Sequence, residues 1–192
     1  MRTIEEYKID FNTDEKKSAK KAKQKIDIFE VFQPIISALV VVTLVFLFCF
    51  RVFNVDGPSM APTLENGDRV VVSTIGYKPE RGDIVVLSST DGIRKPIVKR
   101  IIAVAGDVVD INFTSGVVTV NGKEETYSED LTTQQADIAF PITVPEGTVF
   151  VLGDNRDVSL DSRSSRVGCV DQRLIVGKIL FRFFPIGDWK VD

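Results

Sequence analysis

The chain has 192 residues, of which 44% are hydrophobic and 9% aromatic, so it can form one ordinary domain with an appendage or two small domains. Its formal net charge of −3 argues against nucleic acid as the main partner, because phosphate binding requires a basic excess. The sequence has no histidine and only two cysteines, which argues against a zinc site and a disulfide-linked scaffold.

A basic tail precedes an apolar segment near the N-terminus. Residues 16–25 hold six lysines and no acid, within a tail of residues 1–30 that carries eight basic and seven acidic side chains. The next twenty residues, from Val31 to Phe50, contain no charge. As a helix they would be about 30 Å long, the thickness of the hydrocarbon core of a bilayer. The run is apolar on all sides, whereas a core helix of a soluble domain has a polar face.

We therefore predict a transmembrane anchor over residues 31–53. No small-x-small cleavage site follows it, so we expect the anchor to be retained rather than removed as a secretory signal peptide. Lysine-rich flanks stay on the cytoplasmic side of a membrane. The prediction is a single-pass protein of the cell membrane, with residues 1–30 in the cytoplasm and residues 51–192 outside it.

After residue 66 the sequence changes to short β-branched runs separated by turn residues, which is the pattern of strands. The predicted strands lie within residues 69–74, 83–89, 97–106, 107–113, 116–122, 148–154 and 175–184. Thr114-Ser115-Gly116 and Asn121-Gly122 are turn signals. No long helical period follows Arg51. The fold class is therefore mainly β, with antiparallel strands and one N-terminal membrane helix.

The region of residues 110–145 is richer in polar residues and poorer in apolar runs than its surroundings. We interpret it as a small inserted subdomain, with residues 54–109 and 146–192 forming the main domain. The aromatic stretch of residues 181–189 is either a membrane-facing patch or part of the core. Cys49 lies in the most apolar segment, far from Cys169 along the chain, so we expect two free thiols.

The first candidate for chemistry is the stretch GPSMAPTL, residues 57–64. Ser59 lies between the Gly57-Pro58 pair and Pro62, a setting that suits a fixed, exposed hydroxyl. Serine in such a stretch is usually a helix N-cap or turn residue. To act as a nucleophile it needs a base, and histidine is absent.

The second candidate is Lys99, which with Arg100 interrupts the apolar run of residues 97–106. One alternative is an edge strand whose lysine prevents aggregation. The other is a general base. Free lysine titrates near 10.4, but burial in apolar surroundings lowers its pKa by roughly 3–5 units. A neutral amine of that kind can take the proton of a hydroxyl.

The third candidate is GDNRDVSLDSR, residues 153–163, directly after an apolar strand. Its acids and arginines are interleaved, which indicates an ion-paired, rigid turn rather than a solvated loop. A hydroxyl in this stretch, such as that of Ser159, could orient a neutral lysine amine through a hydrogen bond, as aspartate orients histidine in the Ser-His-Asp triad.

In this order, the segments DGPSMAPTL, KRIIAVAGD and GDNRDVSLDSR resemble those of bacterial type I signal peptidases, membrane-anchored Ser/Lys proteases that remove signal peptides from exported proteins. The resemblance covers the anchor and nearly all of residues 54–184. It implies a signal-peptidase-like antiparallel β catalytic core with a small inserted β subdomain. It also implies signal peptides of secreted preproteins and the lipid bilayer as partners, and no cofactor, metal or nucleic acid.

Residue by residue, the resemblance makes Ser59 the acylating nucleophile and Lys99 the general base, with Ser159 holding the amine. The residues it implies as structural supports of the site are Asp161 and Arg163, as a salt bridge, together with Asp154 and Arg100. The residues it implies as the lining of pockets for small side chains, which give an Ala-x-Ala preference, are Phe53, Val55, Leu64 and Val98.

Two features depart from the family pattern. Some members carry, two residues before the nucleophile, a serine that donates to the oxyanion, and here that position is Gly57. The spacing to Gly168 is also longer than in the commonest pattern, which leaves the alignment of residues 164–172 open. Three alternatives stay open: a processing peptidase for a narrow substrate set such as pilins, a non-catalytic anchored β-domain, and a self-cleaving repressor. The last would need a DNA-binding helix-turn-helix in place of the anchor.

Overall fold

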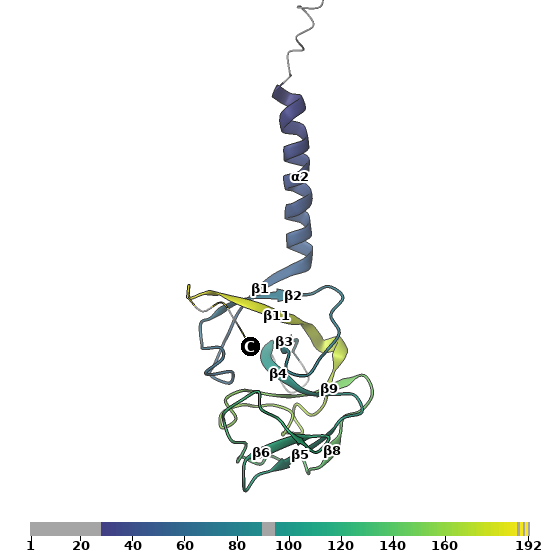
Figure 1. Ribbon diagram of the computed structural model, residues 1–192, viewed down its shortest axis with the longest axis vertical. Coiled ribbons are helices and arrows are strands. Elements are labelled where there is room, and N and C mark those ends of the chain that lie inside the picture. Colours follow the sequence, from purple (N-terminus) through teal and green to yellow (C-terminus); the bar gives the residue numbers. More distant parts are fainter. Residues whose placement is uncertain (1–27, 90–94, 188, 190, 192) are drawn as a thin grey trace, which may run out of the picture. The chain divides into compact units, whose positions relative to one another are not determined.

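The computed structural model describes residues 28–89, 95–187, 189 and 191 (Figure 1). The chain divides into two compact units, residues 1–45 and residues 46–192. The lysine run, and with it most of the predicted cytoplasmic tail, lies outside the described residues.

Helix α2 (Ile28–Cys49) is the N-terminal apolar helix. Its stretch Val31–Cys49 has 19 residues and a mean hydropathy of 2.5, and none of it is buried within the protein, so by length and composition it can cross a membrane. The hydroxyl of Thr43 donates to Leu39 O at 2.8 Å, which satisfies a polar group that a bilayer would leave without water. The anchor was expected to end at residue 53, but helix α2 ends at Cys49 and strand β1 begins at Phe50.

The larger sheet consists of seven strands in the order β1-β2-β11-β3-β4-β9-β10, and all its pairs are antiparallel. Its strands are β1 (Phe50–Asn54), β2 (Arg69–Ser73), β3 (Ile84–Leu87), β4 (Ile97–Val104), β9 (Thr148–Leu152), β10 (Val170–Asp171) and β11 (Ile175–Phe184). After Cys49, the described part of the chain has one further helical element, the 3₁₀ helix η1 (Gln172–Leu174). The mainly β fold class is therefore confirmed.

The second sheet has the order β7-β6-β5-β8. Its strands are β5 (Val108–Asn112), β6 (Val117–Val120), β7 (Lys123–Glu124) and β8 (Ile142–Thr143). Asn121 and Gly122 connect β6 to β7 with φ values of 53° and 75°, as a two-residue hairpin turn of the Asn-Gly type requires. Every predicted strand range contains an observed strand, whereas β1, β7, β8 and β10 were not predicted.

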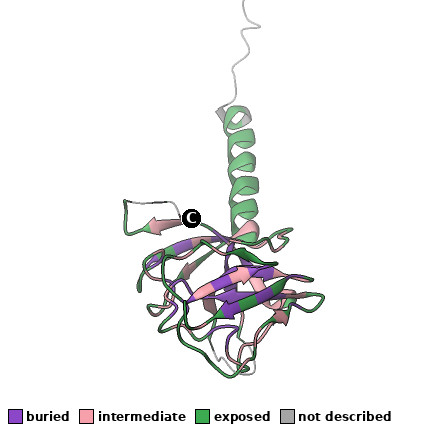
Figure 2. Cartoon of the chain, turned by 60° about the horizontal axis from the view of Figure 1, so that its bottom comes forward, coloured by how far each residue is buried: buried purple, intermediate pink, exposed green. Residues whose placement is uncertain are grey.

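The two sheets share a hydrophobic core. Ile102 of β4 and Phe150 of β9 are buried in one cluster with Val109 and Val118 of the second sheet. In Figure 1, β4 and β9 lie between the second sheet and the strands β1, β2 and β11. The buried residues lie on the strands and their connecting segments, whereas residues 31–48 of α2 are exposed (Figure 2). The region expected as an insertion thus forms its own sheet within one compact unit, and its limits at residues 110 and 145 stay predictions.

The aromatic stretch of residues 181–189 begins within β11, and its described residues are open to solvent from Phe184 onward. Phe184, Ile186 and Trp189 are exposed, and Phe181 is half-buried against Trp189, with ring centroids 6.3 Å apart. The interpretation as a surface patch is therefore favoured over the interpretation as core. The prediction of free thiols at both cysteines is confirmed.

Candidate active site

Ser59 lies on a tight turn between β1 and β2. Gly57 has a φ of 99°, which favours glycine, and its N–H donates to Asn66 Oδ1 at 2.9 Å. The side chains of Met60 and Leu64, which follow Ser59 in the chain, are buried in the core. These buried side chains fix the backbone that carries the Ser59 hydroxyl. Ser59 itself stays partly exposed.

The amine of Lys99, a residue of β4, contacts the hydroxyl of Ser59. Lys99 Nζ lies 2.7 Å from Ser59 Oγ and 2.9 Å from Val98 O, and the residue is only 3% exposed. Strand β4 pairs with β3 along Ile97–Arg100 and with β9 only from Arg100 onward. The alternative of a solvated lysine that guards a strand edge is wrong because the side chain of Lys99 is buried.

Burial lowers the pKa of Lys99 to about 8, because the charged amine is removed from water. The carboxylates of Asp161 and Asp154 oppose this shift, and the positive charge of Arg163 adds to it. The net result is an amine whose neutral form is accessible close to neutral pH.

Arg100, the next residue along β4, forms a buried fork with Asp154. Its Nε lies 2.9 Å from Asp154 Oδ1 and its Nη2 lies 2.8 Å from Asp154 Oδ2. Thr63, from the turn that carries Ser59, donates to the same carboxylate at 2.6 Å. Asp154 therefore ties the serine turn to the lysine strand.

A second buried fork joins Asp161 to Arg163. Arg163 Nε lies 2.8 Å from Asp161 Oδ1, and Nη2 lies 3.0 Å from Oδ2. The expected salt bridge is thus present. The interleaved pairing expected within residues 153–163 is only partly correct, because Arg156 pairs with Glu125 of a distant segment at 2.8 Å.

Ser159 does not hold the lysine amine in this structure. Within residues 28–89 and 95–187, its Oγ is the buried side-chain oxygen without a hydrogen-bond partner. Ser159 Oγ lies close to Gly153, where a Cβ added to the glycine would be only 2.3 Å from it. The same Cβ would lie 2.4 Å from Ser59 O, so position 153 requires glycine.

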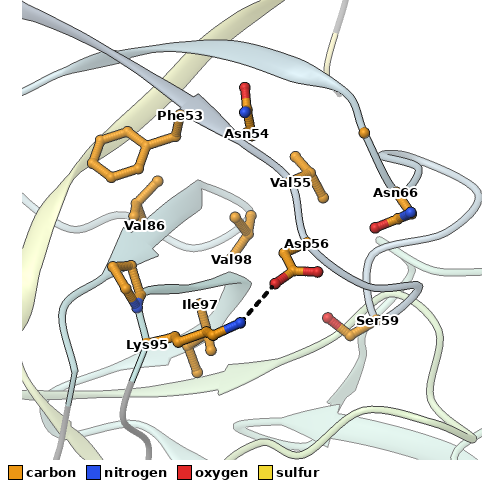
Figure 3. Close-up of a pocket in the computed structure, with 12 residues that line it drawn as sticks. Phe53, Asn54, Val55, Asp56, Ser59, Asn66, Val86, Lys95, Ile97 and Val98 are labelled. Carbon is orange, nitrogen blue, oxygen red and sulfur yellow. Dashed lines mark hydrogen bonds and ion pairs between the residues drawn. The ribbon is translucent and has the colours of Figure 1, made fainter.

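A cavity of about 470 Å³, lined by both apolar and polar residues, opens beside Ser59. Figure 3 shows Ser59 at one end and Phe53 and Val86 at the other. The predicted residues Phe53, Val55 and Val98 line it. Leu64 does not, because its side chain is fully buried in the cluster beneath.

Sequence reasoning missed the charged mouth of this cavity. Asp56 and Lys95 form an ion pair of 3.3 Å across it (Figure 3). Their side chains are 77% and 80% exposed. The only available signal was the position of Asp56 three residues before Ser59, and nothing in the sequence pairs it with Lys95.

A hydroxyl in contact with a buried amine of lowered pKa, next to a cavity, is the arrangement of a serine hydrolase that uses lysine as its base. A family model described as "Signal peptidase, peptidase S26" matches residues 28–184. The chain belongs to this family of serine peptidases.

Two curated relatives are similar over most of the chain. Signal peptidase I of Bacillus licheniformis is 36% identical over 183 residues, which cover 88% of this chain and 95% of the relative. Signal peptidase IB of Staphylococcus aureus (strain COL) is 36% identical over 186 residues, which cover 86% and 94%. A solved signal peptidase I from Enterococcus faecalis V583 is 29% identical, covers 54% of this chain and 98% of the solved one, and has a TM-score of 0.45.

Proposed function

We propose that this chain is a membrane-bound serine endopeptidase that cleaves signal peptides from exported preproteins after small residues. Ser59 is the nucleophile and Lys99 is the general base. The observation that carries the proposal is the 2.7 Å contact between Lys99 Nζ and Ser59 Oγ at a buried position of β4.

The lowered pKa makes the amine a usable base. With a pKa of about 8, roughly one Lys99 in ten is neutral at pH 7, against roughly one in 2,500 for a free lysine. The neutral amine accepts the hydroxyl proton along the existing contact, so that Ser59 Oγ can attack a carbonyl carbon.

The reaction then follows as two acyl transfers. Attack by Ser59 gives a tetrahedral intermediate, which collapses to an ester as Lys99 returns the proton to the leaving amine. Water, deprotonated by Lys99, attacks the ester, and the signal peptide leaves as a carboxylic acid with Ser59 restored. The mature protein is the amine product of the first step.

The oxyanion of the intermediate requires a donor, and Gly57 does not supply one. It has no hydroxyl, and its N–H already donates to Asn66 Oδ1. We assign the backbone N–H of Ser59 as one donor. The loss of a single donor of this kind typically costs about 3 kcal/mol of transition-state stabilisation.

The Arg100–Asp154 and Asp161–Arg163 forks are the structural supports of the site. They hold the residues that surround Lys99 and supply the opposing charges that keep its pKa from falling further. Ser159, whose Oγ is buried, stays in the proposed site as a neighbour of Gly153.

The cavity suits an extended peptide. In the described chain, β9 pairs with β4 only from Arg100 onward, and β1 pairs only with β2. The edges of β1 and of Ile97–Lys99 can therefore accept an added strand. Alternate side chains of a strand face the same way, which fits a rule that names two positions separated by one residue, as in Ala-x-Ala. Phe53, Val55 and Val98 would contact these small side chains.

Helix α2 supports membrane anchoring of the enzyme. We propose that residues 1–30 are cytoplasmic and that the catalytic unit, residues 54–109 and 146–192 with the insertion at 110–145, is extracytoplasmic. The lysine run before the helix supports this orientation through the positive-inside rule. A signal peptide in the same bilayer would then reach the enzyme by diffusion within the plane of the membrane.

The test uses the full-length chain in detergent micelles with a secreted precursor. We expect cleavage after a small residue, located by mass spectrometry, and loss of cleavage in Ser59→Ala. Ser115→Ala, which alters an exposed serine of the β5–β6 turn, is the matched control and should cleave normally. No cleavage of any precursor by the wild type would favour the non-catalytic binding domain instead. Cleavage restricted to one precursor would favour the specialised processing peptidase.

A further inference from the structure

A buried ion pair joins the second sheet to the loop that follows β9. Arg156 Nη2 donates to Glu125 Oε2 at 2.8 Å, and both side chains are 2% exposed. Arg156 Nη1 donates to Thr132 Oγ1 at 2.7 Å, and Nε donates to Gly153 O at 3.1 Å. Each nitrogen of the guanidinium thus has a partner. Two partners come from residues 125–132 and one comes from the loop.

Glu125 and Thr132 are themselves fixed on the second sheet. Glu125 N donates to Val118 O at 2.9 Å, and Thr132 N donates to Gly116 O at 2.8 Å. A Cβ at Gly116 would lie 2.6 Å from the Leu131 Cβ, so this segment packs closely on the β5–β6 turn. The position of the Arg156 guanidinium is therefore set by the β5–β6 hairpin.

From Arg156 the network continues to the backbone of Ser59. Gly153, whose carbonyl accepts from Arg156, packs directly against Ser59 O. Asn155 N donates to Ser59 O at 3.1 Å. Ser128, from the same segment as Glu125, donates to Asp154 O at 2.8 Å. Residues 153–155 thus hold the carbonyl of the nucleophile, and the second sheet holds residues 153–156.

We propose that Glu125 and Thr132 are positioning residues for peptide cleavage. They fix Arg156, which fixes the loop that supports Ser59, and so the second sheet has a task in catalysis although it contributes no reacting group. The inference rests on the proposed function. Because a displacement of about 1 Å at a reacting group can lower a rate by about a hundredfold, a shift of this loop is expected to affect turnover.

The experiment measures kcat and KM of the full-length chain in micelles. Glu125→Gln keeps the shape of the side chain and removes its charge. We expect kcat to fall by about tenfold or more. KM should change by less than about twofold, because neither Glu125 nor Arg156 lines the cavity. The pH midpoint of kcat/KM should move little, because Glu125 is not among the charges that shift the pKa of Lys99.

Thr132→Val removes one hydrogen bond from Arg156 and leaves the ion pair in place. We expect the same pattern with a smaller fall in kcat, and this variant carries the test if Glu125→Gln does not fold. The matched control is Asp107→Asn, which breaks another ion pair of the same unit, with Arg81 Nε 2.6 Å from Asp107 Oδ2. It should lower the thermal unfolding midpoint and leave kcat of the folded enzyme unchanged.

Wild-type kcat in both Glu125→Gln and Thr132→Val would overturn the inference. So would a loss of kcat that disappears once the variants are assayed well below their unfolding midpoints, since that pattern indicates a purely structural role. Failure of the proposed function would be distinct, because the wild-type chain itself would then cleave no precursor.

Discussion

The two sides of the site use the same kinds of charged residue in opposite ways. Behind Lys99, the Arg100–Asp154 and Asp161–Arg163 pairs are buried forks. At the mouth of the cavity, Asp56 and Lys95 form a single contact of 3.3 Å between exposed side chains. Buried forks fix one geometry, whereas an exposed pair is worth little and can exchange partners. In the proposed mechanism, the side that carries the chemistry is therefore rigid, and the side that would meet the substrate is adaptable.

Lys95, just before β4, and Lys99, within it, show the same contrast. Lys95 is 80% exposed and precedes the strand, whereas Lys99 is 3% exposed within it. Four positions along the chain thus separate a solvated cation from an amine whose pKa is lowered to about 8. Depth in the sheet, and not residue type, decides which lysine can act as a base.

The largest expected effect comes from breaking a buried fork. Asp154→Asn removes the negative charge from the buried fork with Arg100, so the free energy of unfolding should fall by about 3–5 kcal/mol. Cleavage should weaken as well, because Thr63 and the serine turn lose their anchor. Thermal or chemical unfolding in micelles measures the change. A loss below about 1 kcal/mol would show that this fork is no more important than an exposed pair.

A smaller effect should come from the buried amine itself. Between pH 8 and 10.5 the unfolded chain binds a proton at Lys99 that the folded chain does not, so stability rises with pH through this window. Relative to Lys99→Met, the wild type should gain about 3 kcal/mol between pH 7 and pH 10.5. Parallel unfolding series of the two proteins measure this difference. If the difference in unfolding free energy between the two proteins stays constant across that pH range, burial does not shift the pKa of Lys99.

The smallest effect belongs to the mouth of the cavity. Asp56→Asn removes the exposed pair with Lys95, so the free energy of unfolding should change by less than about 1 kcal/mol. The change should disappear at high salt, which screens exposed charges. Unfolding at low and high ionic strength provides the test. A salt-independent loss of several kcal/mol would remove the contrast between the two sides of the site.

Much of the fold followed from local patterns in the sequence. β-branched runs between turn residues predicted the strands from Arg69 to Phe184, and Asn121-Gly122 predicted its hairpin. The end of α2 was misplaced because the apolar run continues past Cys49 into β1, where composition no longer distinguishes helix from strand.

The site was predictable only where a motif or a known family carried it. The contact between Ser59 and Lys99 joins residues 40 positions apart, and resemblance rather than spacing brought them together. The sequence did not predict the ion pair between Glu125 and Arg156, because their contact depends on how the second sheet packs. Leu64 was misassigned because an apolar residue beside a site can line a cavity or lie beneath it, and composition does not separate the two.

The most direct test of the neutral amine is the pH dependence of precursor cleavage by the wild type and by Lys99→Arg. Arginine keeps the charge but cannot lose its proton. For the wild type, kcat/KM should rise about tenfold per pH unit below a pKa of about 8 and level off above it. Lys99→Arg should not cleave at any pH. A flat wild-type profile, or full activity of Lys99→Arg, would contradict the account.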